Sequence, residues 1–372
     1  MAKTLMAVDA GTGSVRAVLF SLEGEQLGCV QREWTHKEDP RYPGSMDFDW
    51  VHNWDLARGC IRGVIEQTGV DPHDIAAVST TCMREGIVLY DKDGQEIWAC
   101  ANVDARSDDE VAQLVHMNPE LEKQIYRESG QTYALGALPR LFWVKNKMPE
   151  VYEKTAVCTM FNDWLIYKMT GVFSSEPSNA CTTGIFDLKA RDWDDKIAAS
   201  IGLKTGIFPK ISECGTVVAK VGAKGAAETG LAEGTPVVAG GGDAQLGCVG
   251  VGVVDANQAA IFGGSFWQYE YNTDEAKTDE HCRVRVNCHS VPGIWQYEAL
   301  AFKPGMVMRW YRDAFCQYEK ELSKTTGRDP YDLMNEKAKD IPAGCYGMMC
   351  AFSDVMNYIS WRHASPMFIN FD

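Results

Sequence analysis

The sequence predicts an α/β protein of two domains, and three observations support this class. The chain has 372 residues, which is more than one hydrophobic core usually supports. Residues 1–33 show the pattern of three short strands, and residues 47–69 then change to a helical period. Residues 259–271 repeat the opening order of strand, Gly/Ser loop and strand, as a duplicated fold would. We therefore expect two related halves that pack closely, because no Pro-rich or Ser-rich linker separates them.

The first predicted strand pair contains a loop suited to binding an anion. Residues 5–8 are apolar and lead into Asp9 and a loop of sequence Ala-Gly-Thr-Gly-Ser at 10–14. Glycines at positive φ let backbone N–H groups converge on a phosphate, the hydroxyls of Thr12 and Ser14 add donors, and Asp9 can hold a metal. A second strand follows at once, which excludes the Walker P-loop and the dinucleotide-binding fingerprint because both need a helix there. A hairpin turn without a ligand is the alternative for this segment taken alone.

Strands and helices alternate along the rest of the chain. Apolar residues recur at three- and four-residue spacing in 47–69, where Gly69 supplies a stop, and strands are predicted at 75–81 and 87–89. The later predictions are helices at 107–115, 139–147 and 162–169, a strand at 236–240, and a helical run of small residues after 245 to about 254. The stretch 344–372 is apolar and aromatic, so it needs a surface that covers it.

The composition is that of an ordinary globular enzyme. Hydrophobic residues make up 45% and charged residues 23% of the chain, and no apolar run is long enough for a membrane span. Asp9 interrupts the first apolar stretch too early for a signal peptide, and the thirteen scattered cysteines indicate reduced thiols. The net charge of −15 opposes binding to nucleic acid or anionic lipid. We expect a cytoplasmic protein that binds neither nucleic acid nor membrane.

Three further motifs follow in order: Arg84-Glu85, then residues 241–243, then residues 263–265. Asp243 lies between a strand end and a helix start, where the helix N-terminus favours the ionised carboxylate that a general base needs. A helix N-cap is the local alternative for this aspartate. Arg84 and Glu85 would offer a fork of donors and an acceptor to a polyhydroxyl substrate, with an exposed ion pair as the alternative.

An N-terminal Asp-x-Gly-Thr loop followed by these three motifs resembles the FGGY carbohydrate kinase family, within the actin, hexokinase and Hsp70 ATPase superfamily. The resemblance extends over essentially the whole chain. It implies two ribonuclease H-like domains around an ATP cleft. Residues 1–245 would form the N-terminal domain with the substrate site and the first phosphate loop. Residues 246–372 would form an incomplete second domain, with the second phosphate loop but without the rest of the adenine site.

The resemblance implies phosphoryl transfer from ATP to an alcohol, with Asp243 as the base and Mg²⁺ held through Asp9 and Asp243. The residues that would bind the ATP phosphates are Gly11, Thr12, Gly13, Ser14, Arg16, Gly263, Gly264 and Ser265. The residues that would contact the substrate are Arg84, Glu85, Asp104, Gln245 and Trp267. For Trp267 the alternative is an ordinary core tryptophan.

Several positions depart from the family pattern and favour a substrate with fewer hydroxyls. Glycerol kinases place Gln directly after the base, where this chain has Ala244, and their substrate-side Tyr aligns with Leu135. The aromatic residue often found two positions before Asp104 is Asn102, so the packing around the substrate should differ from that in sugar kinases. Because buried unpaired polar groups are costly, the loss of polar groups at 244 and 135 suits a carbonyl-bearing alcohol such as 4,5-dihydroxypentane-2,3-dione, phosphorylated on a primary hydroxyl. The product would be trapped in the cell as an anion.

Other functions stay open as alternatives. One is a ketopentose kinase of the xylulokinase or ribulokinase type, and another is a truncated relative without catalytic activity. An Hsp70-like nucleotide switch is disfavoured by Arg84-Glu85 and by the absence of an appended peptide-binding domain. By analogy with the family, the candidate protein partners are a second copy of the chain and a phosphotransferase-system regulator.

Overall fold

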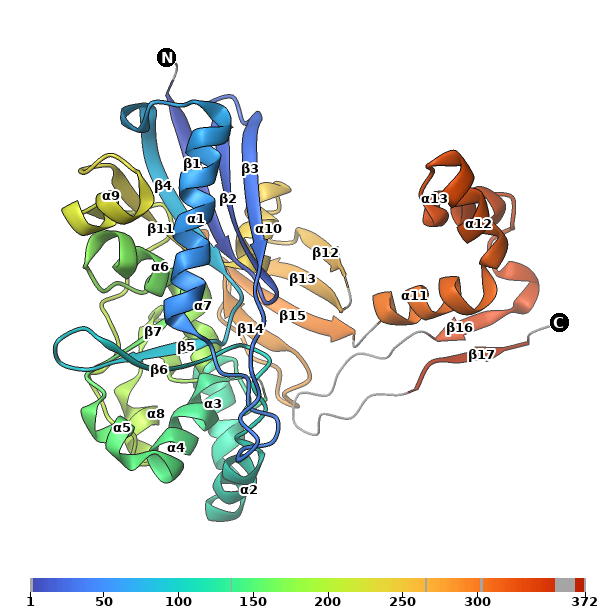
Figure 1. The fold of residues 1–372 in the computed structure, drawn as a ribbon. Helices are drawn as coiled ribbons and strands as arrows, with labels where there is room; N and C mark the ends of the chain where they lie inside the picture. Colours follow the sequence, from blue (N-terminus) through green and yellow to red (C-terminus); the bar gives the residue numbers. More distant parts are fainter. Residues whose placement is uncertain (1–2, 135, 265, 302–303, 352–364, 371–372) are drawn as a thin grey trace.

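The computed structural model describes residues 3–134, 136–264, 266–301, 304–351 and 365–370, and it has the expected mixed α/β architecture (Figure 1). Its main sheet has the strand order β10-β11-β4-β1-β2-β3. These strands are β1 (Thr4–Ala10), β2 (Ser14–Ser21), β3 (Gln26–Glu33), β4 (Ile75–Cys82), β10 (Val217–Lys220) and β11 (Pro236–Gly242). The three strands predicted in the first 33 residues and the strand at 75–81 are therefore confirmed.

Three parallel strands of this sheet end together. β1 runs parallel to β4, and β4 runs parallel to β11. In this register Ala10 lies opposite Cys82, and Cys82 lies opposite Gly242. The loops that follow the three strands therefore leave from one edge of the sheet, which is where α/β proteins usually place their ligands.

Helix α1 (Trp50–Thr68) covers one face of the main sheet (Figure 1). Asp49 begins it by accepting a hydrogen bond from the His52 N–H at 3.0 Å, and Gly69 ends it at φ 64°. The helix lies close to β3, because a Cβ on Gly63 would be 3.2 Å from the Val30 side chain. The helix and its glycine stop agree with the prediction from the sequence.

Two smaller sheets lie beside the main one. The first has the order β6-β5-β7 and the second the order β12-β13-β15-β14. Their strands are β5 (Ile87–Tyr90), β6 (Glu96–Cys100), β7 (Val157–Met160), β12 (Ala259–Gly263), β13 (Trp267–Thr273), β14 (Arg285–Cys288) and β15 (Trp295–Ala301). The ribbon β8 (Phe186–Asp187) with β9 (Asp192–Trp193) is separate. The strand, loop and strand predicted at 259–271 correspond to β12 and β13.

The other helices of this body are α2 (Asp108–Met117), α3 (Leu121–Ser129), α4 (Ala137–Lys147), α5 (Pro149–Lys154), α6 (Phe161–Thr170), α7 (Pro177–Ala180), α8 (Asp195–Ser200), α9 (Ala223–Thr229) and α10 (Asp243–Gly250). Short 3₁₀ turns occur at Pro72–Asp74 and Cys181–Thr183. Helix α10 ends at Gly250, earlier than the predicted end near residue 254. The predicted domain boundary after residue 245 falls inside α10, and the division into two domains stays a prediction.

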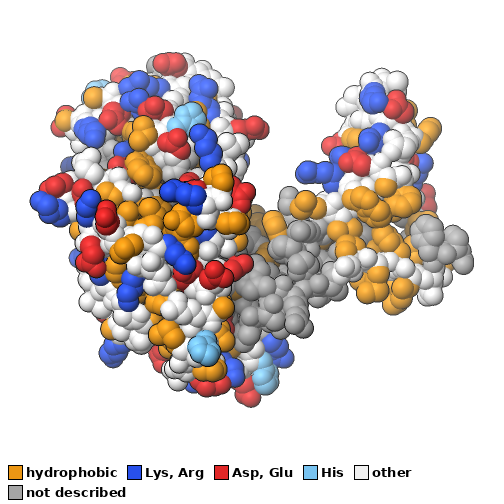
Figure 2. All heavy atoms as spheres, turned by 60° about the horizontal axis from the view of Figure 1, so that its bottom comes forward, with side chains coloured by type: hydrophobic (Ala, Val, Ile, Leu, Met, Phe, Trp, Pro, Cys, Tyr) orange, Lys and Arg blue, Asp and Glu red, His pale blue; other side chains and the backbone are white. Residues whose placement is uncertain are grey.

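The C-terminal segment forms a separate small lobe beside the main body (Figure 1). It contains α11 (Pro304–Phe315), α12 (Gln317–Thr326), α13 (Pro330–Ala338), β16 (Met349–Ala351) and β17 (Met367–Ile369). Many hydrophobic side chains lie on its surface (Figure 2), among them Trp310 at 53% and Tyr346 at 84% exposure. This exposure agrees with the expectation that the described part of 344–372 needs a covering surface.

The thirteen cysteines all lie among the described residues, and each is free. The described helices include none whose length and apolar character would let it cross a lipid bilayer.

Candidate active site

Asp243 lies at the junction between β11 and helix α10. Gly242 caps the helix in extended geometry, and Asp243 is its first residue, so the N-cap alternative for Asp243 is wrong. Its Oδ1 accepts a hydrogen bond from the Ala244 N–H at 2.8 Å. The side chain is 49% exposed, which leaves the carboxylate accessible from solvent.

Close packing explains the three glycines before Asp243. A Cβ on Gly240 would lie 1.5 Å from the carbonyl oxygen of Thr80 on the neighbouring strand. A Cβ on Gly242 would lie 2.9 Å from Cδ of Arg84. A larger residue at 240 would push β11 away from β4, and one at 242 would displace the side chain of Arg84, so these two glycines bring Asp243 next to the residues that follow β4.

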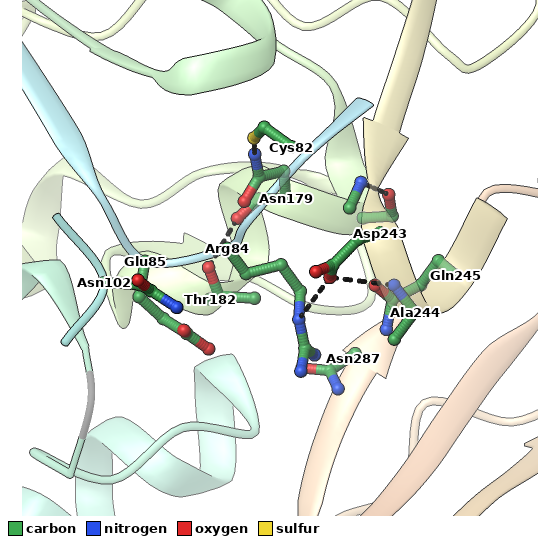
Figure 3. Close-up of polar contacts among 12 residues, drawn as sticks. Cys82, Arg84, Glu85, Asn102, Asn179, Thr182, Asp243, Ala244, Gln245 and Asn287 are labelled. Atoms are coloured by element: carbon green, nitrogen blue, oxygen red, sulfur yellow. Dashed lines mark hydrogen bonds and ion pairs between the residues drawn. The ribbon is translucent and has the colours of Figure 1, made fainter. Parts of the chain in front are cut away.

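Arg84 runs from the end of β4 toward Asp243 (Figure 3). Its Nε lies 3.6 Å from Asp243 Oδ1, and its Nη1 lies 2.5 Å from Glu298 Oε2. The Oε1 of Glu85 accepts instead from Arg285 Nη1 at 2.7 Å. Arg84 and Glu85 are both buried and have different partners, so the alternative of an exposed ion pair between them is wrong. Glu85 has φ 66°, a backbone value that is strained for a residue other than glycine.

The surroundings raise the pKa of Asp243 to about 6 because they reduce the hydration of its charge, and the Arg84 guanidinium opposes this shift. We expected the helix N-terminus to favour the ionised form, and the net direction is the opposite. A carboxylate with this pKa is a stronger proton acceptor than an ordinary aspartate and is still mostly ionised near neutral pH.

The loop between β1 and β2 presents its backbone amides on one side. The Trp34 Nε1–H donates to the carbonyl oxygens of Gly11 at 3.0 Å and Thr12 at 3.2 Å, and His36 Nε2 lies 2.7 Å from the Thr12 oxygen. Because a trans peptide directs C=O and the next N–H in opposite directions, the N–H groups of Thr12 and Gly13 point away from these rings. Such amides can bind an anion.

Gly11 and Gly13 do not have the positive φ that we predicted for them. Instead, Gly13 leaves open space, because a Cβ placed there would meet no atom within 4 Å. The absence of a side chain at this position allows a ligand to approach the backbone closely.

Asp9 and Asp243 lie near the same edge. Asp9 and Gly241 both lie opposite Thr81, in register on either side of β4. Asp9 Oδ2 accepts from Arg16 Nε at 2.8 Å, so the Arg16 guanidinium is bound to a carboxylate here. Two carboxylates near a phosphate loop suit Mg²⁺, which prefers few protein oxygens and keeps waters or phosphate oxygens as its other ligands. Asp9 and Asp243 would hold the ion.

The loop that we predicted as the second phosphate loop follows β12. The Gly264 N–H donates to the carbonyl oxygen of Phe266 at 2.9 Å, and Ser265 lies outside the described residues. Trp267 lies opposite Gly263 across the strand pair and is 43% exposed. The alternative of a core tryptophan is therefore wrong for Trp267.

Two predicted substrate residues are buried in internal contacts. The Asp104 side chain has no exposed surface; it accepts from Arg106 Nε at 2.8 Å and from the Met46 N–H at 2.6 Å. Gln245 is fully buried, and its Nε2 donates to Gln296 Oε1 at 2.9 Å. In this structure both side chains are occupied by contacts within the protein and do not face solvent.

Four residues of this region were not predicted from the sequence: Arg140, Glu270, Arg285 and Glu298. Arg140 on α4 donates to the carbonyl oxygens of Glu85 at 2.5 Å and Asn102 at 2.6 Å, which ties two loops together. The other three are charged residues on the buried faces of β13, β14 and β15. In a strand whose side chains alternate between polar and apolar, a charged residue is a weak signal of function. Its role becomes clear only when its partners in the structure are known.

Comparison with known proteins supports an enzyme with this fold and these motifs. Residues 4–250 match the model of the FGGY family of carbohydrate kinases, N-terminal domain. The autoinducer-2 kinase of Klebsiella pneumoniae is 48% identical over 98% of this chain and 69% of its own length. That of Photorhabdus laumondii is 48% identical over 99% and 70%.

Solved structures agree on the fold. A xylulose kinase from Rhodospirillum rubrum superposes with a TM-score of 0.84 at 22% identity, covering 100% of this chain and 73% of that one. Plasmodium falciparum glycerol kinase with ADP gives 0.81 at 17% identity, with coverage of 100% and 73%. The fold is the ribonuclease H-like, actin-type ATPase fold of sugar kinases, and the protein is a kinase of the carbohydrate-kinase class. The chain belongs to the FGGY family.

Proposed function

We propose that the protein transfers the γ-phosphoryl group of ATP to a primary hydroxyl of autoinducer-2, 4,5-dihydroxypentane-2,3-dione. The proposal is supported by relatives called autoinducer-2 kinase at 48% identity over nearly the whole chain. The small number of free polar groups beside Asp243 also supports this substrate, because Arg84 is already paired with Glu298 and Glu85 with Arg285. A site with few free polar groups suits a ligand with carbonyls and few hydroxyls.

The proposed reaction depends mainly on the position of the Asp243 carboxylate. Its accessible carboxylate, with a pKa of about 6, would accept the proton of the attacking hydroxyl. The amides of Thr12 and Gly13, with the loop after β12, would bind the phosphate oxygens and spread their charge. Mg²⁺ would neutralise phosphate charge when it is held by Asp9 and Asp243. Arg84 would keep Asp243 oriented.

The wider role follows from the product. A phosphorylated dione is an anion that does not cross a membrane unaided, so the reaction would retain this quorum-sensing signal inside the cytoplasm. A homodimer and a phosphotransferase-system regulator are the partners that we propose by analogy with the family.

The test is ATP-dependent phosphorylation of the dione, xylulose, ribulose and glycerol by the 372-residue chain. Asp243→Asn should reduce turnover at least about 100-fold, the usual effect of removing a general base. The matched control is Asp93→Asn, since Asp93 is 67% exposed and lies in the turn between β5 and β6, outside the loops that follow β1, β4 and β11. Faster phosphorylation of xylulose or ribulose than of the dione would favour the ketopentose kinase. Absence of transfer by a folded sample would overturn the catalytic proposal for this chain.

A further inference from the structure

One carboxylate, that of Glu298 on β15, contacts two buried arginines. Its Oε2 lies 2.5 Å from Arg84 Nη1, and its Oε1 lies 3.4 Å from Arg285 Nη1. Arg84 continues to Asp243 at 3.6 Å, and Arg285 continues to Glu85 at 2.7 Å. Glu298 therefore joins Asp243, the proposed base, to Glu85 through two arginines.

Burial makes this connection energetically important. The side chains of Glu298, Arg84 and Arg285 are each 2–4% exposed. A buried ion is costly unless an opposite charge and hydrogen bonds compensate it, and removing one partner leaves the other charge uncompensated. Without Glu298, Arg84 would keep only Asp243 as a close carboxylate among the ion pairs of the described residues.

A second carboxyl, Glu270, lies directly opposite Glu298 in the β13–β15 pair. Burial and the Glu298 charge raise the pKa of Glu270 well above its ordinary range. Burial disfavours ionisation of Glu298 as well, but Arg84 and Arg285 outweigh it and lower the Glu298 pKa to about 2. The Glu270 and Glu298 side chains also share a hydrogen bond, in which a neutral Glu270 donates to the Glu298 carboxylate. With Glu270 neutral, the two arginines face three carboxylates: Glu85 and Glu298, which are buried, and Asp243, which is half-exposed.

We propose that Glu298 is a positioning residue for phosphoryl transfer, which holds Arg84 at its distance from Asp243 and holds Arg285 against Glu85. Glu298 acts through the arginines and touches neither ATP nor the alcohol in this scheme. The inference rests on the proposed role of Asp243 as the base. When Glu298 loses its charge, Arg84 moves onto Asp243 in a close ion pair, and the carboxylate is no longer free to accept a proton.

The test compares Glu298→Gln with Glu270→Gln. The two substitutions are the same chemical change at paired positions of one sheet, but only the first removes a negative charge. We expect kcat of Glu298→Gln to fall about 100-fold, as misplacement of a catalytic group can cause, with KM for ATP within about twofold of wild type. Glu270→Gln should keep kcat within about threefold. The double variant, Glu298→Gln with Glu270→Gln, tests whether Glu270 ionises when residue 298 has no charge. If Glu270 does ionise, the double variant should be slower than Glu298→Gln alone.

Two outcomes would overturn the proposal: Glu298→Gln with wild-type kcat, or Glu270→Gln with an equal loss. A general packing defect would lower the unfolding midpoint of both variants together and would not separate kcat from KM. Crystal structures of the variants test the geometry even if the wild-type chain phosphorylates none of the alcohols. Arg84 should shift toward Asp243 in Glu298→Gln and keep its place in Glu270→Gln; an unmoved Arg84 in the first variant refutes the inference.

Discussion

The guanidinium of Arg84 lies 3.6 Å from the carboxylate of Asp243, which is within ion-pair range but beyond hydrogen-bond distance. The same guanidinium lies 2.5 Å from Glu298, a residue on another sheet. A tighter bond to Asp243 would lower its pKa and occupy its oxygen. The observed spacing keeps Asp243 oriented while its pKa stays at about 6.

This pKa gives a pH dependence with a definite sign. The carboxylate accepts a proton only when ionised, so kcat/KM should rise with pH up to about 6 and level off above it. An ordinary aspartate, with a pKa near 3.9, would place the same change about two units lower. The measurement is the initial rate between pH 4.5 and about 8, with unfolding followed at each pH. Constant activity down to pH 4.5 in folded enzyme would contradict the assignment.

Packing of β11 against β4 predicts a large loss of stability for Gly240→Ala. The added Cβ would lie 1.5 Å from the Thr80 carbonyl oxygen, so a strand must move. We expect unfolding to become easier by about 3 kcal/mol, the upper part of the range for overpacking. Gly250→Ala is the control, because a Cβ there meets no atom within 4 Å. If urea unfolding shows the same loss of stability for both variants, β11 accommodates the added Cβ without a cost in free energy.

Trp34 should affect ATP binding through the first phosphate loop. Trp34→Phe removes the N–H that holds the Gly11 and Thr12 carbonyls, and each such bond contributes about 1 kcal/mol. We expect KM for ATP to rise roughly fivefold with a smaller change in kcat. Trp54→Phe is the control: the Trp54 indole is also buried and its N–H also donates, but to the single acceptor Glu228. A rise in KM for ATP in both variants would indicate a general packing effect.

A substitution of Asp104 can distinguish a structural role for this residue from direct contact with the substrate. Its carboxylate is buried against Arg106, so Asp104→Asn leaves a buried cation with only Asp47 as its carboxylate partner among the described residues. We expect a loss of about 3 kcal/mol in stability, typical of a broken buried ion pair, and a KM for the alcohol within about twofold of wild type in the folded fraction. Thermal unfolding and substrate titration together check this. Unchanged stability with a greatly raised KM would restore the predicted substrate contact.

Local patterns predicted most of the fold. The first three strands, α1 with its Gly69 stop, and β12 with β13 depend on side-chain periodicity and glycine placement, which act between neighbours along the chain. The end of α10 and the negative φ of Gly11 were missed, because helix ends and loop angles respond to packing from distant segments.

By itself, the sequence determined the alternation of strands and helices, the order of the motifs and the family they belong to. Only the tertiary structure decided which groups are free to act. It buried Asp104 and Gln245, left Asp243 and Trp267 accessible, and directed Arg84 to a glutamate far along the chain. The reason is physical: exposure, pKa and the partner of a charge depend on what packs around it, and those neighbours come from strands distant in sequence.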